Sequence, residues 1–162
     1  MPTAMTGPAA VGPNLDICTD DQQFPLGTVI DGPQGKRYRY VQFQDAITYV
    51  AGHVVCRGAA ETDYKVTNDA NLMNAGLAPE GVVFQSTPPT ENQYGWIQIA
   101  GVAKVLIGSA AVTAGDWLKV DGTTDGAADE ATPGTDEALV GYALATIADT
   151  ATGLVQLTIR GA

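Results

Sequence analysis

The chain has 162 residues, of which 45% are apolar and 16% are charged, and its formal net charge is −10. This length allows one domain with a substantial core or two very small ones, and this apolar content argues against a wholly disordered chain. Only 8 lysines and arginines oppose 18 acidic residues. Nucleic acid is therefore not an expected partner, because phosphate binding requires basic side chains, and an anionic membrane surface would repel the chain.

No apolar run approaches the roughly 20 residues of a membrane span, and no basic segment followed by an apolar core marks an N-terminal signal. The two cysteines, Cys18 and Cys56, cannot form a disulfide framework, so we expect two reduced thiols rather than one bridge. The 19 glycines favour short strands joined by many turns.

Residues 1–23 are predicted to form an extended arm. Prolines and glycines alternate along its first half, which disfavours regular secondary structure. Leu15 and Ile17 are apolar residues that could contact a partner. Two interpretations stay open: a floppy terminus, or a segment that orders on a partner by pairing with an edge strand.

The remaining residues, 24–162, are predicted to form a β-rich domain. A first strand is expected over 24–30, and residues 36–43 then alternate. This alternation puts Arg37 and Arg39 on one face with Val41 and Phe43. These arginines form the main basic cluster and could meet an acidic neighbour, although a solvated face is the simpler explanation.

Further short strands are expected at 47–50, 53–57 and 81–85, and one or two helical turns are expected at 68–75. A β meander over 94–120 follows, in which Gly101 and Gly108 separate apolar segments. Residues 121–137 are predicted to be a long exposed loop, and 138–147 and 154–159 are predicted to be closing strands.

The domain contains an internal echo. Residues 51–55 resemble 114–118, residues 82–84 resemble 140–142, and residues 95–99 resemble 153–157, in the same order. We therefore predict a duplicated β unit, approximately 46–108 and 109–160, whose copies share one core because neither is large enough to bury its own.

No catalytic set is visible, so an enzyme is not expected. His53 is the only histidine, Cys56 three positions on would lie on the opposite strand face, and the position that echoes His53 is Asp116, which favours a turn residue. The same residues do not supply a zinc ligand set, and no cofactor is expected. A hydrolase that uses acidic loop residues is a distant alternative.

A calcium candidate lies in the acidic loop, where oxygen side chains follow the spacing of a calcium-binding loop. Its residues are Asp121, Thr123, Asp125 and Asp129. Thr132 stands where the bidentate glutamate should be, and no helical pattern flanks the loop, so an acidic hairpin competes with this interpretation. Trp96 and Trp117 could form a sugar platform, but apolar strands surround both, which favours core or interface anchors.

The central stretch carries a resemblance. Residues 95–105 (Gly-Trp-Ile-Gln-Ile-Ala-Gly-Val-Ala-Lys-Val), residues 112–116 (Val-Thr-Ala-Gly-Asp) and residues 140–143 (Val-Gly-Tyr-Ala) resemble a pattern in head decoration, or capsid cement, proteins of tailed bacteriophages. The resemblance covers about residues 94–160. It implies a compact all-β fold, a β-barrel or β-tulip-like domain, here with an extended N-terminal arm.

The same resemblance implies a non-enzymatic virion protein, made in the host cytoplasm and placed on the capsid surface. Its partner would be the major capsid protein, whose neighbouring subunits it would bridge to stabilise the shell, and it would be a homo-oligomer, with a trimer favoured. The alternatives are a glycan-binding module that uses Trp96, Trp117 or the 121–137 loop, and a tail or fibre component of a virion.

Overall fold

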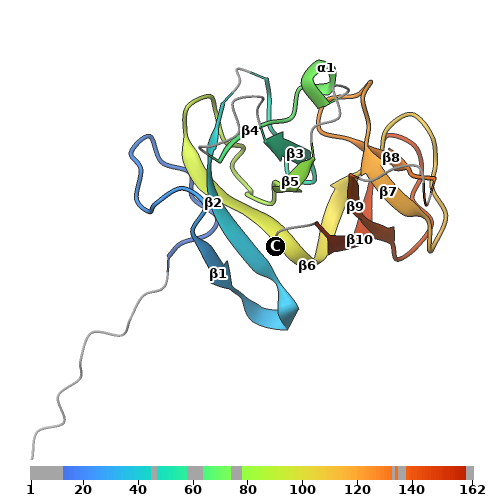
Figure 1. The fold of residues 1–162 in the computed structure, drawn as a ribbon, viewed down its shortest axis with the longest axis horizontal. Coiled ribbons are helices and arrows are strands. Elements are labelled where there is room, and N and C mark those ends of the chain that lie inside the picture. The colour runs from blue at the N-terminus through green and yellow to red at the C-terminus, as the bar shows by residue number, and fades with distance from the viewer. Residues whose placement is uncertain are drawn as a thin grey trace, which may run out of the picture.

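The computed structural model describes residues 13–44, 47–57, 64–73, 78–132, 134 and 138–159 (Figure 1). Strands dominate it, so the predicted all-β class with a barrel is confirmed. The elements are β1 (Val29–Asp31), the 3₁₀ turn η1 (Pro33–Gly35), β2 (Arg37–Phe43), β3 (Val54–Arg57), β4 (Lys65–Thr67), α1 (Ala70–Met73), β5 (Pro79–Val82), β6 (Tyr94–Leu106), β7 (Trp117–Val120), β8 (Ala128–Glu130), β9 (Leu139–Ala143) and β10 (Thr152–Thr158). In the part of the chain that the structure describes, no helix is long and apolar enough to cross a membrane.

Five strands close into a barrel. Strand β2 pairs in parallel with β4 and antiparallel with β6, and β3 and β5 connect β4 to β6 through antiparallel ladders. The order β2-β4-β3-β5-β6 therefore returns to β2. Closure gives each of these strands a neighbour on both sides, which removes the open edges that invite misassociation. Strand β1 pairs with β2 outside this ring.

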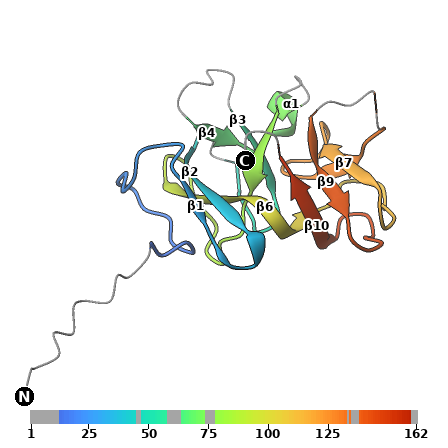
Figure 2. The ribbon, with the colours of Figure 1, turned by 60° about the horizontal axis from the view of Figure 1, so that its bottom comes forward.

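Strand β6 is longer than the barrel needs and continues into a second set of strands. Residues 94–100 pair with β2, and residues 100–106 pair with β10. The change of partner coincides with a bend at Gly101, whose φ of 81° is a conformation that glycine tolerates best. Figures 1 and 2 show β6 running from the β1–β2 side of the molecule to the β9–β10 side.

The second set repeats the pairing plan of the first. From β6 the order is β10-β9-β7-β8, and the sheet returns to the end of β6, where Ile107 bridges Ala128 and the Gly108 N–H donates to the Ala128 carbonyl at 2.9 Å. We call β2 to β5 with residues 94–100 unit 1, and residues 101–108 with β7 to β10 unit 2. Two residues that hold the same place in the two ladders are called counterparts.

The correspondence extends to single turns. Gly52 before β3 and Gly115 before β7 have φ values of 100° and 94°. Their N–H groups donate to the carbonyls of Val83 and Ala143 at 2.7 and 2.8 Å. The two units thus share one hydrogen-bond plan, while the duplication of an ancestral sequence stays a prediction.

The cores correspond residue by residue. Every buried member of the unit 1 core has a counterpart in the unit 2 core. The pairs are Val41 and Val105, Phe43 and Ile107, Tyr49 and Val112, Val55 and Leu118, Val66 and Ala128, Val83 and Ala143, Ile97 and Val155, and Ile99 and Leu157. Two further residues of unit 1, Val54 and Val82, pack into the unit 2 core. The units are therefore joined by packing as well as by β6.

Three predicted elements were wrong. Residues 47–50 form no strand. Residues 121–137 are not a continuous exposed loop, because Ala127 and Ala128 are fully buried and β8 pairs with β7. The first strand is β1 rather than 24–30, because a turn precedes it, in which the Thr28 N–H donates to the Pro25 carbonyl and Gly27 has a φ of 83°.

The described part of the predicted arm lies against unit 1. Thr19 and Tyr94 exchange two backbone hydrogen bonds of 2.9 and 2.8 Å, and Asp16 accepts from the N–H and hydroxyl of Ser86 at 2.7 and 2.6 Å. Cys18 packs against the unit 1 core. We call residues 13–31 the N-terminal segment; residues 1–12 of the predicted arm lie outside the described residues.

Candidate partner-binding face

The outer face of unit 1 is covered by the N-terminal segment. Tyr38, Tyr40 and Trp96 are buried there. The ring of Phe24 lies 5.3 Å from that of Tyr40 and 5.3 Å from that of Trp96. Leu15, Leu26 and Ile30 pack against the same cluster. Alternation along β2 explains the arrangement, since Val41 and Phe43 point to the other side, into the core.

The equivalent face of unit 2 is open. The pair Lys104 and Leu154 is the counterpart of Tyr40 and Trp96, and Leu144 is the counterpart of Phe84. Leu154 is 49% exposed and Leu144 is 43% exposed. We call this surface the open face; its residues are Val102, Lys104, Trp117, Tyr142, Leu144 and Leu154. Clustered exposed apolar side chains of this kind mark interaction surfaces.

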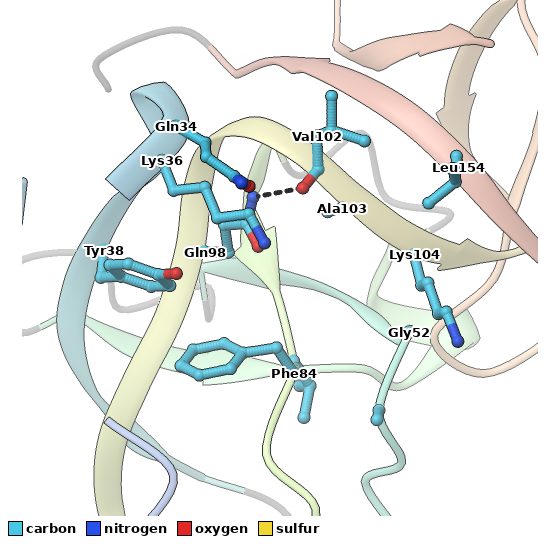
Figure 3. A pocket seen from close by; sticks show the side chains of 12 residues that line it. Gln34, Lys36, Tyr38, Gly52, Phe84, Gln98, Val102, Ala103, Lys104 and Leu154 are labelled. Carbon is cyan, nitrogen blue, oxygen red and sulfur yellow. Dashed lines mark hydrogen bonds between the residues drawn. The ribbon is translucent and has the colours of Figure 1, made fainter. Parts of the chain in front are cut away.

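A cleft of about 440 Å³ lies between the covered face and the open face (Figure 3). Tyr38 and Phe84 of unit 1 form one side, with ring centroids 5.0 Å apart. Lys104 and Leu154 lie on the unit 2 side. The full lining is Gln34, Lys36, Tyr38, Ala51, Gly52, Val83, Phe84, Gln98, Val102, Ala103, Lys104 and Leu154.

The bend of β6 shapes this cleft. The side-chain amide of Gln98 donates to the carbonyls of Ala100 and Val102 at 2.9 and 3.0 Å, which ties the strand across Gly101. A Cβ at Gly101 would lie 3.0 Å from the Lys36 Cα. The absence of a side chain therefore lets the turn η1 approach β6 and brings Lys36 to the cleft.

The cleft is basic in an acidic protein. Lys36 and Lys104 are its only charged residues, whereas the whole chain has a net charge of −10. The ion pairs within the described residues involve other cations. An anionic group is thus the complementary ligand, since apolar walls strengthen its attraction to an ammonium group.

Arg39, predicted as a partner-contact residue, instead lies inside unit 1. It is 6% exposed and forms an ion pair with Glu80, whose other oxygen accepts from Arg57 at 3.1 and 2.8 Å. The Arg57 guanidinium also lies 4.5 Å from the centre of the Tyr64 ring. The expectation of a solvated face was wrong for Arg39 because Glu80 reaches it from β5.

The other predicted contact residues do not gather at one place. Leu15 packs under the N-terminal segment, whereas Ile17 is 53% exposed beside a cavity of about 300 Å³ at the edge of the covered face. Arg37 is partly exposed and donates to Asp31 at 3.1 Å. Contact of these three residues with a partner stays a prediction.

The candidate calcium ligands take part in hydrogen bonds within the protein. Asp121 accepts from the Thr123 N–H and hydroxyl at 2.8 and 2.6 Å, and Asp125 accepts from the Ala70 N–H at 2.9 Å. Asp129 accepts from the next N–H along β8 at 2.9 Å. No three histidine, cysteine or acidic side chains of the described ranges group in a way that could hold a metal ion.

The aromatic and thiol candidates are mostly enclosed. Trp96 is 2% exposed and cannot serve as a sugar platform, whereas Trp117 is half-buried with its ring 5.5 Å from that of Tyr142 on the open face. Both cysteines are free, as expected. Burial raises the pKa of Cys18 to about 11 and that of Cys56 to about 12, which keeps both as unreactive thiols.

Comparison with known proteins finds a structural likeness and no sequence relative. No family model matches the chain, and no curated protein matches it. Among solved structures, the chain is similar to the head fiber gp8.5 N base of bacteriophage phi29. The TM-score is 0.53 at 13% sequence identity, over 75% of this chain and 94% of that chain. At this identity the likeness shows a shared fold.

Proposed function

We propose that this chain is a structural, non-catalytic protein of a bacteriophage virion, placed on the outside of the head. The observation that carries the proposal is the shared fold with a phage head fibre base, since the match covers nearly all of that structure. The resemblance of residues 95–105 to head decoration proteins supports the same conclusion independently.

On the shell, the protein would bind the major capsid protein and bridge neighbouring subunits, as a homo-oligomer with a trimer favoured. A bridging protein gains affinity by contacting several subunits at once. The open face and the adjacent cleft offer the apolar contact area that such binding needs, with Leu144 and Leu154 as its most exposed members.

Co-sedimentation with purified empty heads tests the proposal. Wild-type protein is expected to pellet with the heads in a saturable way, and Leu144→Asp/Leu154→Asp is expected to stay in the supernatant. Leu72→Asp is the matched control, because Leu72 is 38% exposed on α1 and lies outside the open face. Wild-type protein that never pellets with heads would contradict the proposal.

A fibre base is the second candidate, favoured by the structural neighbour itself. A base would hold a projecting fibre, whereas a decoration protein would strengthen the shell. Electron microscopy of virions that lack the protein separates the two. Loss of projecting fibres with intact shells indicates a base, and fragile shells indicate a decoration protein.

A further inference from the structure

The two units have equivalent outer faces. In unit 1 this face is covered by a segment of chain, whereas in unit 2 it is exposed. In unit 1 a non-helical stretch of chain lies over Tyr40 and Trp96, places the Phe24 ring against both, and pairs through Thr19 with Tyr94. In unit 2 the counterparts of Tyr40 and Trp96 are Lys104 and Leu154, and Leu154 is 49% exposed.

The covering segment has a definite chemistry. Residues 13–31 contain Asp16, Asp20, Asp21 and Asp31 and no lysine or arginine. Its apolar anchors Leu15, Phe24, Leu26 and Ile30 are spread along a stretch of turns that ends in the short strand β1, with no helix. Main-chain pairing with alternating apolar anchors is a recurrent way for a β protein to bind a peptide.

The open face differs from the covered one by gaining positive charge. Lys104 stands where unit 1 has Tyr40, and Lys36 lines the cleft beside it. No carboxylate lines this cleft. A segment that covers the open face should therefore carry carboxylates next to its apolar side chains, because an acidic protein with a basic cleft selects against basic segments.

We infer that the open face and the cleft bind an extended, acidic segment of a partner polypeptide. Its apolar side chains would pack on Val102, Leu144 and Leu154, and its carboxylates would lie near the ammonium groups of Lys36 and Lys104, which line opposite sides of the cleft. The inference rests on the comparison of the open face with the covered face of unit 1. It therefore does not depend on whether the protein binds a capsid.

The test uses the full chain and a fluorescent synthetic peptide with the sequence of residues 13–30, which already fits the covered face. Fluorescence anisotropy should show saturable binding that weakens as salt is added. Lys36→Glu/Lys104→Glu and Leu144→Ser/Leu154→Ser should each weaken binding at least about tenfold. Leu72→Ser should bind like wild type, and circular dichroism should show that all variants fold.

A second peptide, with every aspartate replaced by asparagine, should bind about tenfold more weakly than the first. Equal binding of the two peptides, equal binding by the double variants, or no saturable binding to wild type would overturn the inference. Sedimentation velocity adds another arm. Self-association that Leu144→Ser/Leu154→Ser abolishes and that excess peptide does not displace would assign the face to the folded body of a second copy and also overturn it.

Discussion

Three charged side chains in unit 1 occupy places that are apolar in unit 2. Arg39, Arg57 and Glu80 have Ala103, Val120 and Val140 as counterparts. The same strand pairing therefore forms with these buried charges in unit 1 and without them in unit 2. Replacing a buried ion pair with well-packed apolar groups is often neutral, whereas removing one partner leaves a charge uncompensated.

Glu80→Ala is accordingly expected to lower the free energy of unfolding by about 3–5 kcal/mol, since two guanidinium groups lose their carboxylate. Arg39→Met/Arg57→Met/Glu80→Leu should stay within roughly 1 kcal/mol of wild type. Urea unfolding measures both. A triple variant as unstable as Glu80→Ala would show that the ion cluster itself stabilises the barrel.

His53 makes the fold sensitive to mild acid. Its Nδ1 lies 2.9 Å from the Asn68 amide nitrogen, which also donates to the Thr48 carbonyl at 3.1 Å, so this contact favours a ring without a proton on Nδ1. Burial lowers the pKa of His53 below its ordinary value of 6.5, and the nearby Asp125 opposes this shift. The unfolded chain therefore binds the proton more readily, and stability is lost as the pH falls below about 6.5.

Urea unfolding at pH values of about 7.5 and 5.5 should show this loss in wild type and not in His53→Gln. Asp116→Asn, at the counterpart position, is the control. Hydrogen bonds from Thr113 hold the Asp116 pKa below 3.8, so the pH dependence in this range should be unchanged. A slope that persists in His53→Gln would assign the effect to another group.

At the scale of the strand, one glycine in each unit admits a neighbouring strand, and the two are not equally replaceable. A Cβ on Gly141 in β9 would lie 2.1 Å from the Gln156 carbonyl oxygen. A Cβ on Gly81 in β5 would lie 2.6 Å from the Ile97 Cδ1, the flexible end of a side chain, and at the looser distance of 3.0 Å from the Gln98 carbonyl oxygen. The Gln156 backbone cannot move away from Gly141 without breaking hydrogen bonds between β9 and β10.

Gly141→Ala is thus expected to lower the free energy of unfolding by about 3 kcal/mol or more, and Gly81→Ala by about 1 kcal/mol. Chemical denaturation of the two variants under the same conditions makes the comparison. Equal losses of unfolding free energy would mean that moving β9 away from β10 costs no more than changing the Ile97 rotamer.

The covered face of unit 1 also carries a prediction. Phe24→Ala should cost about 2 kcal/mol, because a half-buried ring leaves Tyr40 and Trp96, and should shift Trp96 fluorescence to longer wavelength. Leu154→Ala on the open face should cost less than about 0.5 kcal/mol. A similar cost for both variants would show that packing of the N-terminal segment contributes little to the stability of the fold.

Sequence periodicity predicted much of this element structure. The alternation of residues 36–43 separated Tyr38 and Tyr40 from Val41 and Phe43, and the structure places them on opposite faces. The echo of residues 51–55 at 114–118 matched β3 to β7 in the correct register. The echo of 82–84 at 140–142 was displaced by two residues, because paired strands make Gly81 and Gly141 the counterparts.

What the sequence could not predict are contacts between distant segments. Arg39 has the pattern of a surface residue, and only the fold brings Glu80 to it from 41 positions away. The open face was missed for the same reason, since alternation distinguishes two strand faces but not which face another segment covers. The repeat could have indicated the open face, because Trp96 and Leu154 are counterparts. Trp96 is covered by Phe24, whereas Leu154 is exposed.

As a whole molecule, the two units should unfold together. They share β6, and Val54 and Val82 of unit 1 complete the unit 2 core. Trp96 reports on unit 1 and Trp117 on unit 2, so the variants Trp117→Phe and Trp96→Phe isolate the two signals. In each variant the remaining tryptophan signal and far-UV circular dichroism, which reports on both units, are expected to give the same urea midpoint, and Val54→Ala should lower both midpoints by the same amount. Two separate midpoints would show independent units.

The continuity of β6 also bears on how the molecule would carry a mechanical load. A pull applied through β2 reaches β10 along one unbroken stretch of main chain, since both strands run antiparallel to β6 and hydrogen-bond to consecutive parts of it. Tension would act on these ladders in shear, loading many hydrogen bonds together instead of opening them one by one. Units 1 and 2 would then resist stretching together rather than extend one after the other.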